Sequence, residues 1–172
     1  IISGTGSYIP ERIVDNSHFL ENEFYTIKNE KIQKTNEEII EKFHDITCIR
    51  ERRYADDGLS TSDIAYEAAK MALEGVDRET LDCIIVAHNY GDVKPGTVRV
   101  DLCPSLAARV KHRLGIENPF AVAFDVPFGC PGWLHGMIIA DYYIKSGDAK
   151  KVLVIGAEIL SRVIDSHDID CM

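Results

Sequence analysis

Cys130 stands where a short apolar run ends and a helical pattern begins, so it is placed for nucleophilic chemistry. The apolar run 121–126 meets a turn at 127–129, and apolar residues then recur at helical spacing over 133–139. Pro131 suits the first position of a helix, because proline lacks the N–H that would be unpaired there. We therefore expect Cys130 to be the N-cap or first-turn residue of a buried helix, where the helix dipole lowers the pKa of a thiol. This placement predicts a catalytic cysteine that takes up an acyl group.

A cysteine in this position also has a simpler interpretation. Free cysteines are among the most buried residue types, and most of them only pack. The flanking glycines, Gly129 and Gly132, favour chemistry over packing. The pattern is still not the nucleophile elbow of the hydrolases, which needs a glycine where this chain has Phe128. From the residues alone, both a nucleophile and an inert packed cysteine remain open.

The composition is that of an ordinary globular protein and excludes several classes. The chain has 172 residues, enough for one domain, with 45% hydrophobic and 27% charged residues. Its net charge of −9 argues against nucleic-acid binding and against an anionic membrane surface. No apolar run approaches the roughly 18 residues of a membrane span, and the first residues lack the pattern of a signal peptide.

The cysteines and histidines give no sign of a disulfide framework or of a metal site. The five cysteines are scattered and never form a C-x-x-C pair, which favours a reducing, cytoplasmic setting. The six histidines show no H-x-x-x-H spacing. Asp165, Asp168 and Asp170 could suggest a metal, but their spacing has no glycine turn and no later glutamate, so we expect a solvated loop there. We expect no metal and no cofactor.

The elements that must position Cys130 alternate between strands and helices. We expect an N-terminal strand that runs into the loop at 3–10, a short helix capped at 15–17 and ending at Phe24, and a polar loop or insertion within 25–45 that includes a helix at 37–43. Further along we expect strands at 49–55, 81–88, 121–126 and 151–157, and helices at about 61–74, 104–114 and 131–146. Arg50, Arg52 and Arg53 on the strand 49–55 suit either phosphate contacts or a solvated edge with ion pairs. The order predicts an α/β fold with a mostly parallel sheet flanked by helices.

Several blocks of this sequence together resemble one enzyme family. They are GTGSYIPER, TCIRERRYA, TSDIAYEAAKMALEG, LDCIIVA, PSLAARVKHRLGI, FDVPFGCPGW and YYIKSGDAKKVLVIGAEILSR, in this order along the chain. As a set they resemble β-ketoacyl-acyl-carrier-protein synthase III of the thiolase superfamily. The resemblance implies a thiolase-like half, and it places the nucleophile of the family on Cys130.

The resemblance also implies a reaction and its partners. An acyl group passes from acyl-coenzyme A to the cysteine and then condenses with malonyl-acyl carrier protein, with loss of carbon dioxide, to start a fatty acid. It implies a homodimer in which Cys103 falls at the position that lines the acyl pocket of the partner. Phe128 and Trp133 are further candidates for lining an acyl pocket, and a core role suits both as well. In such enzymes the attack on the thioester forms an oxyanion, which is held by backbone N–H groups, one of them from the nucleophile itself.

The blocks cover only the N-terminal half of that family. The histidine and asparagine that drive decarboxylation belong to the second half, so we expect residues 1–172 alone to be unable to condense. The chain also departs from the family at three positions. Cys48 stands where the family usually has glycine. Ile39 or a neighbour stands in place of a tryptophan that stacks on the adenine of coenzyme A, and Ile169 stands in place of an arginine near that adenine. A related condensing enzyme of a specialised pathway and a catalytically silent partner subunit therefore remain alternatives.

Overall fold

The computed structural model describes residues 1–168, which form two compact units. The first unit consists of Ile1–Tyr8 and Asp57–Ile159 and contains Cys130. The second consists of Ile9–Asp56 and the described residues from Leu160 onward. The prediction made for Ile169 lies outside the described residues, as do Asp170 and Cys171.

The first unit is built on a three-stranded parallel sheet. Its strands are β3 (Cys83–His88), β6 (Val122–Pro127) and β7 (Val152–Gly156), in the order β6-β3-β7. In the register Ile85 lies opposite Phe124 on one side and Val154 on the other. All six residues of β3 are buried, as expected for the central strand of a sheet covered on both faces. The predicted strands and the predicted parallel sheet are confirmed.

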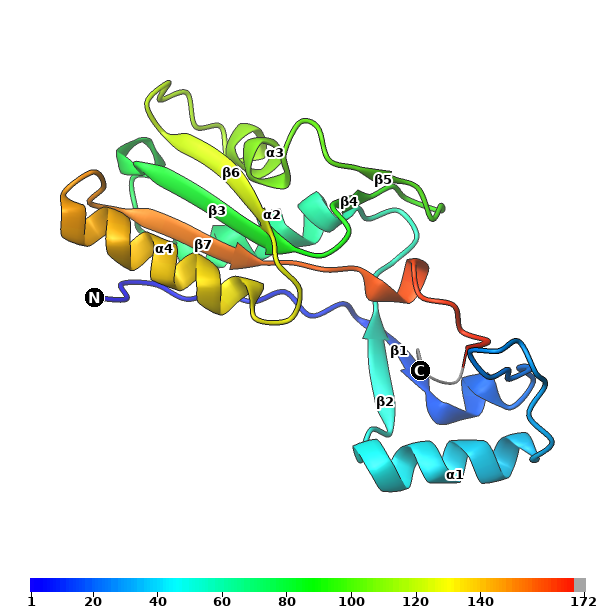
Figure 1. Ribbon diagram of the computed structural model, residues 1–172. Helices are drawn as coiled ribbons and strands as arrows, with labels where there is room; N and C mark the ends of the chain where they lie inside the picture. The colour runs from blue at the N-terminus through cyan, green and yellow to red at the C-terminus, as the bar shows by residue number, and fades with distance from the viewer. Residues whose placement is uncertain (169–172) are drawn as a thin grey trace. The chain divides into compact units, whose positions relative to one another are not determined.

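Helices cover both faces of this sheet. α4 (Gly132–Ser146) lies on one face, and α2 (Thr61–Ala72) and α3 (Leu106–Arg113) lie on the other (Figure 1). Because successive residues of a strand point to opposite faces, β3 serves both layers. Ile84 and Val86 pack with α2 and α3, whereas Cys83 and Ile85 pack with Ala140 of α4.

The N-terminal residues differ from the prediction, because they form no strand. Residues 1–8 pack against α2, and a Cβ at Gly4 or Gly6 would overlap the carbonyl oxygen of Ala72 or Ala68. A strand needs a neighbouring strand for its N–H and C=O groups, and none of the described strands pairs with this segment. Glycine at these two positions therefore serves close packing.

The predicted loop 89–103 contains a small ribbon of its own. β4 (Asp92–Val93) and β5 (Val100–Asp101) pair antiparallel, and the segment returns to the sheet just before α3. Asp92 and Val93 are buried, so this ribbon is part of the packed unit.

The second unit packs a helix and a ribbon around its own small core. β1 (Arg12–Asp15) pairs antiparallel with β2 (Glu51–Tyr54), and α1 (Asn36–Thr47) begins with a capping box between Thr35 and Glu38. The predicted helix to Phe24 is only the 3-10 turn η1 (Asn16–Phe19). The core consists of Val14, Phe19, Phe24 and Ile39. Within residues 1–168, no helix has the length and apolar character that crossing a membrane requires.

The structure also decides between the two uses considered for the arginines of β2. Arg53 forms an ion pair with Glu51, and Arg52 donates a hydrogen bond to Asn16 and lies over the ring of Phe19. Both guanidinium groups are thus engaged within the second unit, which favours the solvated edge over phosphate contacts.

Candidate active site

Cys130 lies in the turn that joins β6 to α4. β6 ends at Pro127, Gly129 has a left-handed φ of +69°, and the N–H of Gly132 donates to the carbonyl of Gly129 at 2.9 Å. This tight turn brings the chain from the carboxyl end of a parallel strand directly into a helix. The side chain of Cys130 is exposed. Cys130 is therefore not packed in the core of the described residues, and its role as a nucleophile stays a prediction.

The exact helix start differs from the prediction. Pro131 is the N-cap of α4, with φ −82° and ψ 4°, and Cys130 precedes it. The difference arises because the turn closes between Gly129 and Gly132, which leaves Pro131 as the last residue outside the helix. The thiol is thus displaced by one residue from the predicted N-cap or first turn.

The start of α4 is nevertheless open to an anion. Pro131 has no side chain that can accept a hydrogen bond, so the first N–H groups of α4 lack a side-chain cap. Within residues 1–168 the N–H of Cys130 makes no hydrogen bond. Unpaired N–H groups at a helix start favour negative charge, whether on a thiolate or on the oxyanion of an attacked thioester.

Phe128 and Trp133 flank Cys130, and neither belongs to the core of this chain. The ring of Phe128 is stacked on His135 with centroids 4.6 Å apart, and its side chain is 51% exposed. Trp133 is 50% exposed, and its Cβ packs against Gly156 of β7. A Cβ added at Gly156 would lie 3.1 Å from Cβ of Trp133. Their role in an acyl pocket remains a prediction.

Cys103 lies on a different segment, between β5 and α3. It is exposed and precedes Pro104, and Ser105 caps α3 by accepting from the N–H of Ala108. The loop after β3 and the turn after β6 both leave the carboxyl edge of the parallel sheet, the edge where ligands bind in α/β folds. Cys103 is near the end of the loop that leaves this edge after β3, and Cys130 lies in the turn that leaves it after β6.

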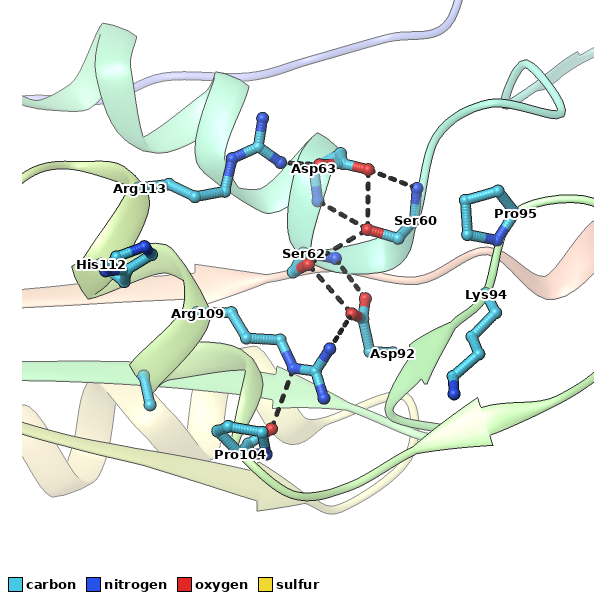
Figure 2. A pocket seen from close by; sticks show the side chains of 11 residues that line it. Ser60, Ser62, Asp63, Asp92, Lys94, Pro95, Pro104, Arg109, His112 and Arg113 are labelled. Atoms are coloured by element: carbon cyan, nitrogen blue, oxygen red, sulfur yellow. Dashed lines mark hydrogen bonds and ion pairs between the residues drawn. The ribbon is translucent and has the colours of Figure 1, made fainter.

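An open pocket of about 670 Å³ lies beside the Cys103 segment, between α2, α3 and the β4–β5 ribbon (Figure 2). None of the site residues predicted from sequence lines it. Arg109 donates to the carboxylate of Asp92 at 2.9 Å and to the carbonyl of Pro104 at 3.0 Å, and Arg113 is paired with Asp63 (Figure 2). Because these charges satisfy one another, the pocket offers no free charge for a ligand.

The same set of contacts shows what the sequence analysis missed. Asp92 is buried and accepts from the N–H and the hydroxyl of Ser62, so it holds the first turn of α2. In the sequence, Asp92 was one charge in a predicted loop, and no spacing pattern linked it to Arg109 or to Ser62. Within residues 1–168 no cluster of three or more His, Cys, Asp or Glu side chains is placed to hold a metal ion.

Comparison with known proteins decides the family. A family model described as 3-oxoacyl-[acyl-carrier-protein (ACP)] synthase III matches residues 124–172, which include the Cys130 turn. The β-ketoacyl-[acyl-carrier-protein] synthase III of Ehrlichia canis (strain Jake) is 39% identical over 170 residues, covering 98% of this chain and 46% of that protein. The chain belongs to the β-ketoacyl-[acyl-carrier-protein] synthase III family. It spans about half the length of the curated relatives it matches.

Solved structures of this family share the fold. The synthase III of Thermus thermophilus has a TM-score of 0.75 at 33% identity, over 97% of this chain and 45% of that one. The priming β-ketosynthase of the R1128 polyketide biosynthetic pathway also has a TM-score of 0.75, at 30% identity over 96% of this chain and 43% of that one. The α/β, thiolase-like half predicted from sequence is thereby confirmed.

Proposed function

We propose that the protein to which this chain belongs is an acyltransferase of fatty acid biosynthesis, with Cys130 as its nucleophile. The thiolate attacks the thioester carbonyl of an acyl-coenzyme A. A new carbon–sulfur bond forms to Cys130, the bond to the coenzyme A sulfur breaks, and coenzyme A leaves as its thiol after taking up a proton. The acyl group then condenses with malonyl-acyl carrier protein, with loss of carbon dioxide.

One observation carries this proposal: the exposed thiol of Cys130 at the junction of β6 and α4, in a chain of this family. The N–H of Cys130, which has no partner among residues 1–168, supports it, because a backbone N–H at that point can stabilise the oxyanion that forms on the acyl carbonyl. We place Phe128 and Trp133 beside the acyl chain on the strength of their exposure next to the thiol.

The remaining parts of the proposal concern the whole protein. We propose a homodimer in which Cys103 of one copy lines the acyl pocket of the other, and acyl carrier protein as the second partner. The residues that promote decarboxylation, a histidine and an asparagine, would lie outside residues 1–172. The scattered cysteines, which form no C-x-x-C pair, fit a cytoplasmic setting.

The test uses the full-length protein and a panel of acyl-coenzyme A thioesters from acetyl to octanoyl. After incubation, peptide mass spectrometry locates the adducts. We expect an acyl mass on the peptide with Cys130 and none in a Cys130→Ala variant. Cys48 is also exposed, lies outside the proposed acyl pocket and serves as the internal control for nonspecific transfer. An adduct on Cys48 as large as that on Cys130, or no adduct at all in the folded protein, would refute Cys130 as the nucleophile and favour a silent partner subunit.

A second candidate is a priming enzyme of a specialised pathway. The observation in its favour is the likeness to the R1128 priming β-ketosynthase, which equals the Thermus thermophilus enzyme in TM-score. The same acyl panel separates the two candidates. A single strong preference for an acyl group other than acetyl favours the specialised pathway, whereas preference for acetyl favours the start of ordinary fatty acids.

A further inference from the structure

His88 is a buried histidine whose two ring nitrogens are both engaged. It ends β3, and its side chain is 1% exposed. Nδ1 accepts the N–H of Gly91 at 2.9 Å, so the ring hydrogen must reside on Nε2. Nε2 donates to Oδ2 of Asp125 at 3.1 Å. The imidazole therefore acts as a neutral link between the segment after β3 and the middle of β6.

Asp125 carries this link to the start of α3. Its Oδ2 also accepts the N–H of Leu106 at 2.7 Å, and its Oδ1 accepts the N–H of Ala107 at 2.8 Å. These are the first two residues of α3, whose N–H groups have no partner inside the helix. The orientation of the Asp125 carboxylate thus fixes where α3 begins, and with it the adjoining Cys103–Pro104 segment.

Gly91, which donates to His88, contacts the residues on the N-terminal side of Cys103. It has a left-handed φ of +76°, and a Cβ there would lie 2.6 Å from Cδ2 of Leu102 and 2.8 Å from the carbonyl oxygen of Asp101. Gly91 therefore packs directly against the residues that precede Cys103. Through Gly91, which contacts Leu102, and through Asp125, which binds the start of α3, His88 is connected to the chain on both sides of Cys103.

We propose that His88 is a positioning residue that sets the place of Cys103 and thereby the acyl-chain selectivity of the enzyme. This inference rests on the proposed function, in which Cys103 lines an acyl pocket of a second copy. His88 acts through Asp125 and Gly91 and not on the reacting atoms. Its loss should therefore change which acyl chain fits more than whether Cys130 reacts.

The experiment compares His88→Leu, His88→Gln and His112→Gln in the full-length protein. Glutamine at position 88 can still donate an N–H toward Asp125, and leucine cannot. His112 is an exposed residue of α3 and controls for the loss of a histidine. For each variant, the rates of Cys130 acylation by acetyl- and octanoyl-coenzyme A in competition give a selectivity ratio.

We expect His88→Leu to change this ratio by about tenfold, the usual effect of a misfitted methylene or two in an apolar pocket. The selectivity ratios of His88→Gln and of His112→Gln should both stay within about twofold of the ratio of the parent protein. Hydrogen exchange at the amides of Leu106 and Ala107 should accelerate in His88→Leu and not in His88→Gln. If His88→Leu does not fold, His88→Asn replaces it, because asparagine can accept from Gly91 but is too short to reach Asp125.

An unchanged ratio in His88→Leu would overturn the proposal. So would an equal loss of rate with both thioesters, because that result marks a structural role alone. If the parent protein takes up no acyl group, the proposed function fails and the selectivity role falls with it. Unchanged amide exchange at Leu106 and Ala107, in contrast, would refute the anchoring by His88 while leaving the acylation of Cys130 untouched.

Discussion

Cys83, at the start of the central strand, links the stability of the fold to pH. Burial and, to a smaller extent, the negative charge of Asp82 together raise the pKa of its thiol from 9.0 to about 11, against a smaller opposite effect of the Ile84 N–H. Because the folded state keeps the thiol protonated to higher pH than the unfolded state does, folding stability is intact below pH 9 and falls between about pH 9 and 11. The slope over that interval is at most about 1.4 kcal/mol per pH unit.

Urea unfolding at several pH values measures this slope. We expect the parent protein to lose stability from pH 9 to 11 and a Cys83→Ala variant to lose less over the same interval, whatever its stability at pH 8. Equal slopes for the two proteins would show that Cys83 has the same pKa in the folded and the unfolded state, which would contradict the prediction.

Cys48 occupies a backbone conformation that suits glycine. It is the C-cap of α1, with φ +57° and ψ 15°, and its N–H donates to the carbonyl of His44. A side chain in this left-handed region costs about 1 kcal/mol. We therefore expect Cys48→Gly to raise the free energy of unfolding by up to about 1 kcal/mol. Cys48→Ala keeps the Cβ and is the control: a gain as large in alanine would trace the effect to the thiol instead of the backbone.

Cys103 is the residue whose size should set the acyl chain length under the proposed function. A phenylalanine there would fill space that a cysteine leaves open. We expect Cys103→Phe to narrow the range of acyl-coenzyme A thioesters that acylate Cys130, with the longest chains lost first. Cys103→Ser, which keeps the volume, should leave the range as it is. An unaltered range in Cys103→Phe would remove Cys103 from the pocket.

At the scale of elements, α4 owes its place on the sheet to three small residues. Gly132, Gly136 and Ala140 recur every fourth position and are the buried residues of α4. A Cβ at Gly132 would lie 3.2 Å from Cβ of Ala87, and one at Gly136 would lie 3.0 Å from Cγ1 of Val154. The backbone of α4 therefore lies almost directly on β3 and β7.

This packing predicts a steep dependence on side-chain size at position 136. Gly136→Leu should lower the free energy of unfolding by about 2–3 kcal/mol, because the helix must lift from the sheet to make room. Gly136→Ala should cost much less, since the higher helix propensity of alanine offsets a small shift of Val154. Thermal or urea unfolding of the two variants checks the difference, and a leucine tolerated as well as alanine would mean that α4 does not lie so close.

The large apolar residues of α4 are correspondingly exposed, which contradicts the predicted buried helix. Trp133 and Leu134 are 50% and 59% exposed, and Ile138 and Tyr142 are exposed as well. The helix forms as its apolar spacing predicts, but its small residues face the sheet because they permit the closest approach of the two backbones.

At the scale of the whole molecule, residues 1–172 correspond to about half of their relatives. We expect a protein consisting of these residues alone to form no β-ketoacyl product from acyl-coenzyme A and malonyl-acyl carrier protein. The physical reason is that the resemblance assigns the decarboxylating histidine and asparagine to the other half of the family. Mass spectrometry of the products, with the full-length protein as the positive control, makes the comparison. Condensation by residues 1–172 would show that they supply these groups themselves.

The sequence by itself determined the local structure and the place of Cys130 between a strand and a helix. The runs that became β3, β6 and β7, the helix after Thr35, and the turn with Cys130 between β6 and α4 follow from short-range patterns. These features depend on residues near one another in the chain, so apolar periodicity and capping residues are sufficient to predict them.

Only the tertiary structure decided which surfaces meet. In the tertiary structure the small residues of α4 face the sheet, and residues 1–8 lie against α2 without pairing with a described strand. His88 is hydrogen-bonded to Asp125, which in turn binds the start of α3. α4 carries apolar residues around most of its surface, so periodicity cannot select the buried side, and a histidine in an apolar run does not show its partner 37 residues away. Packing distance and long-range hydrogen bonds, which no local pattern encodes, settle both.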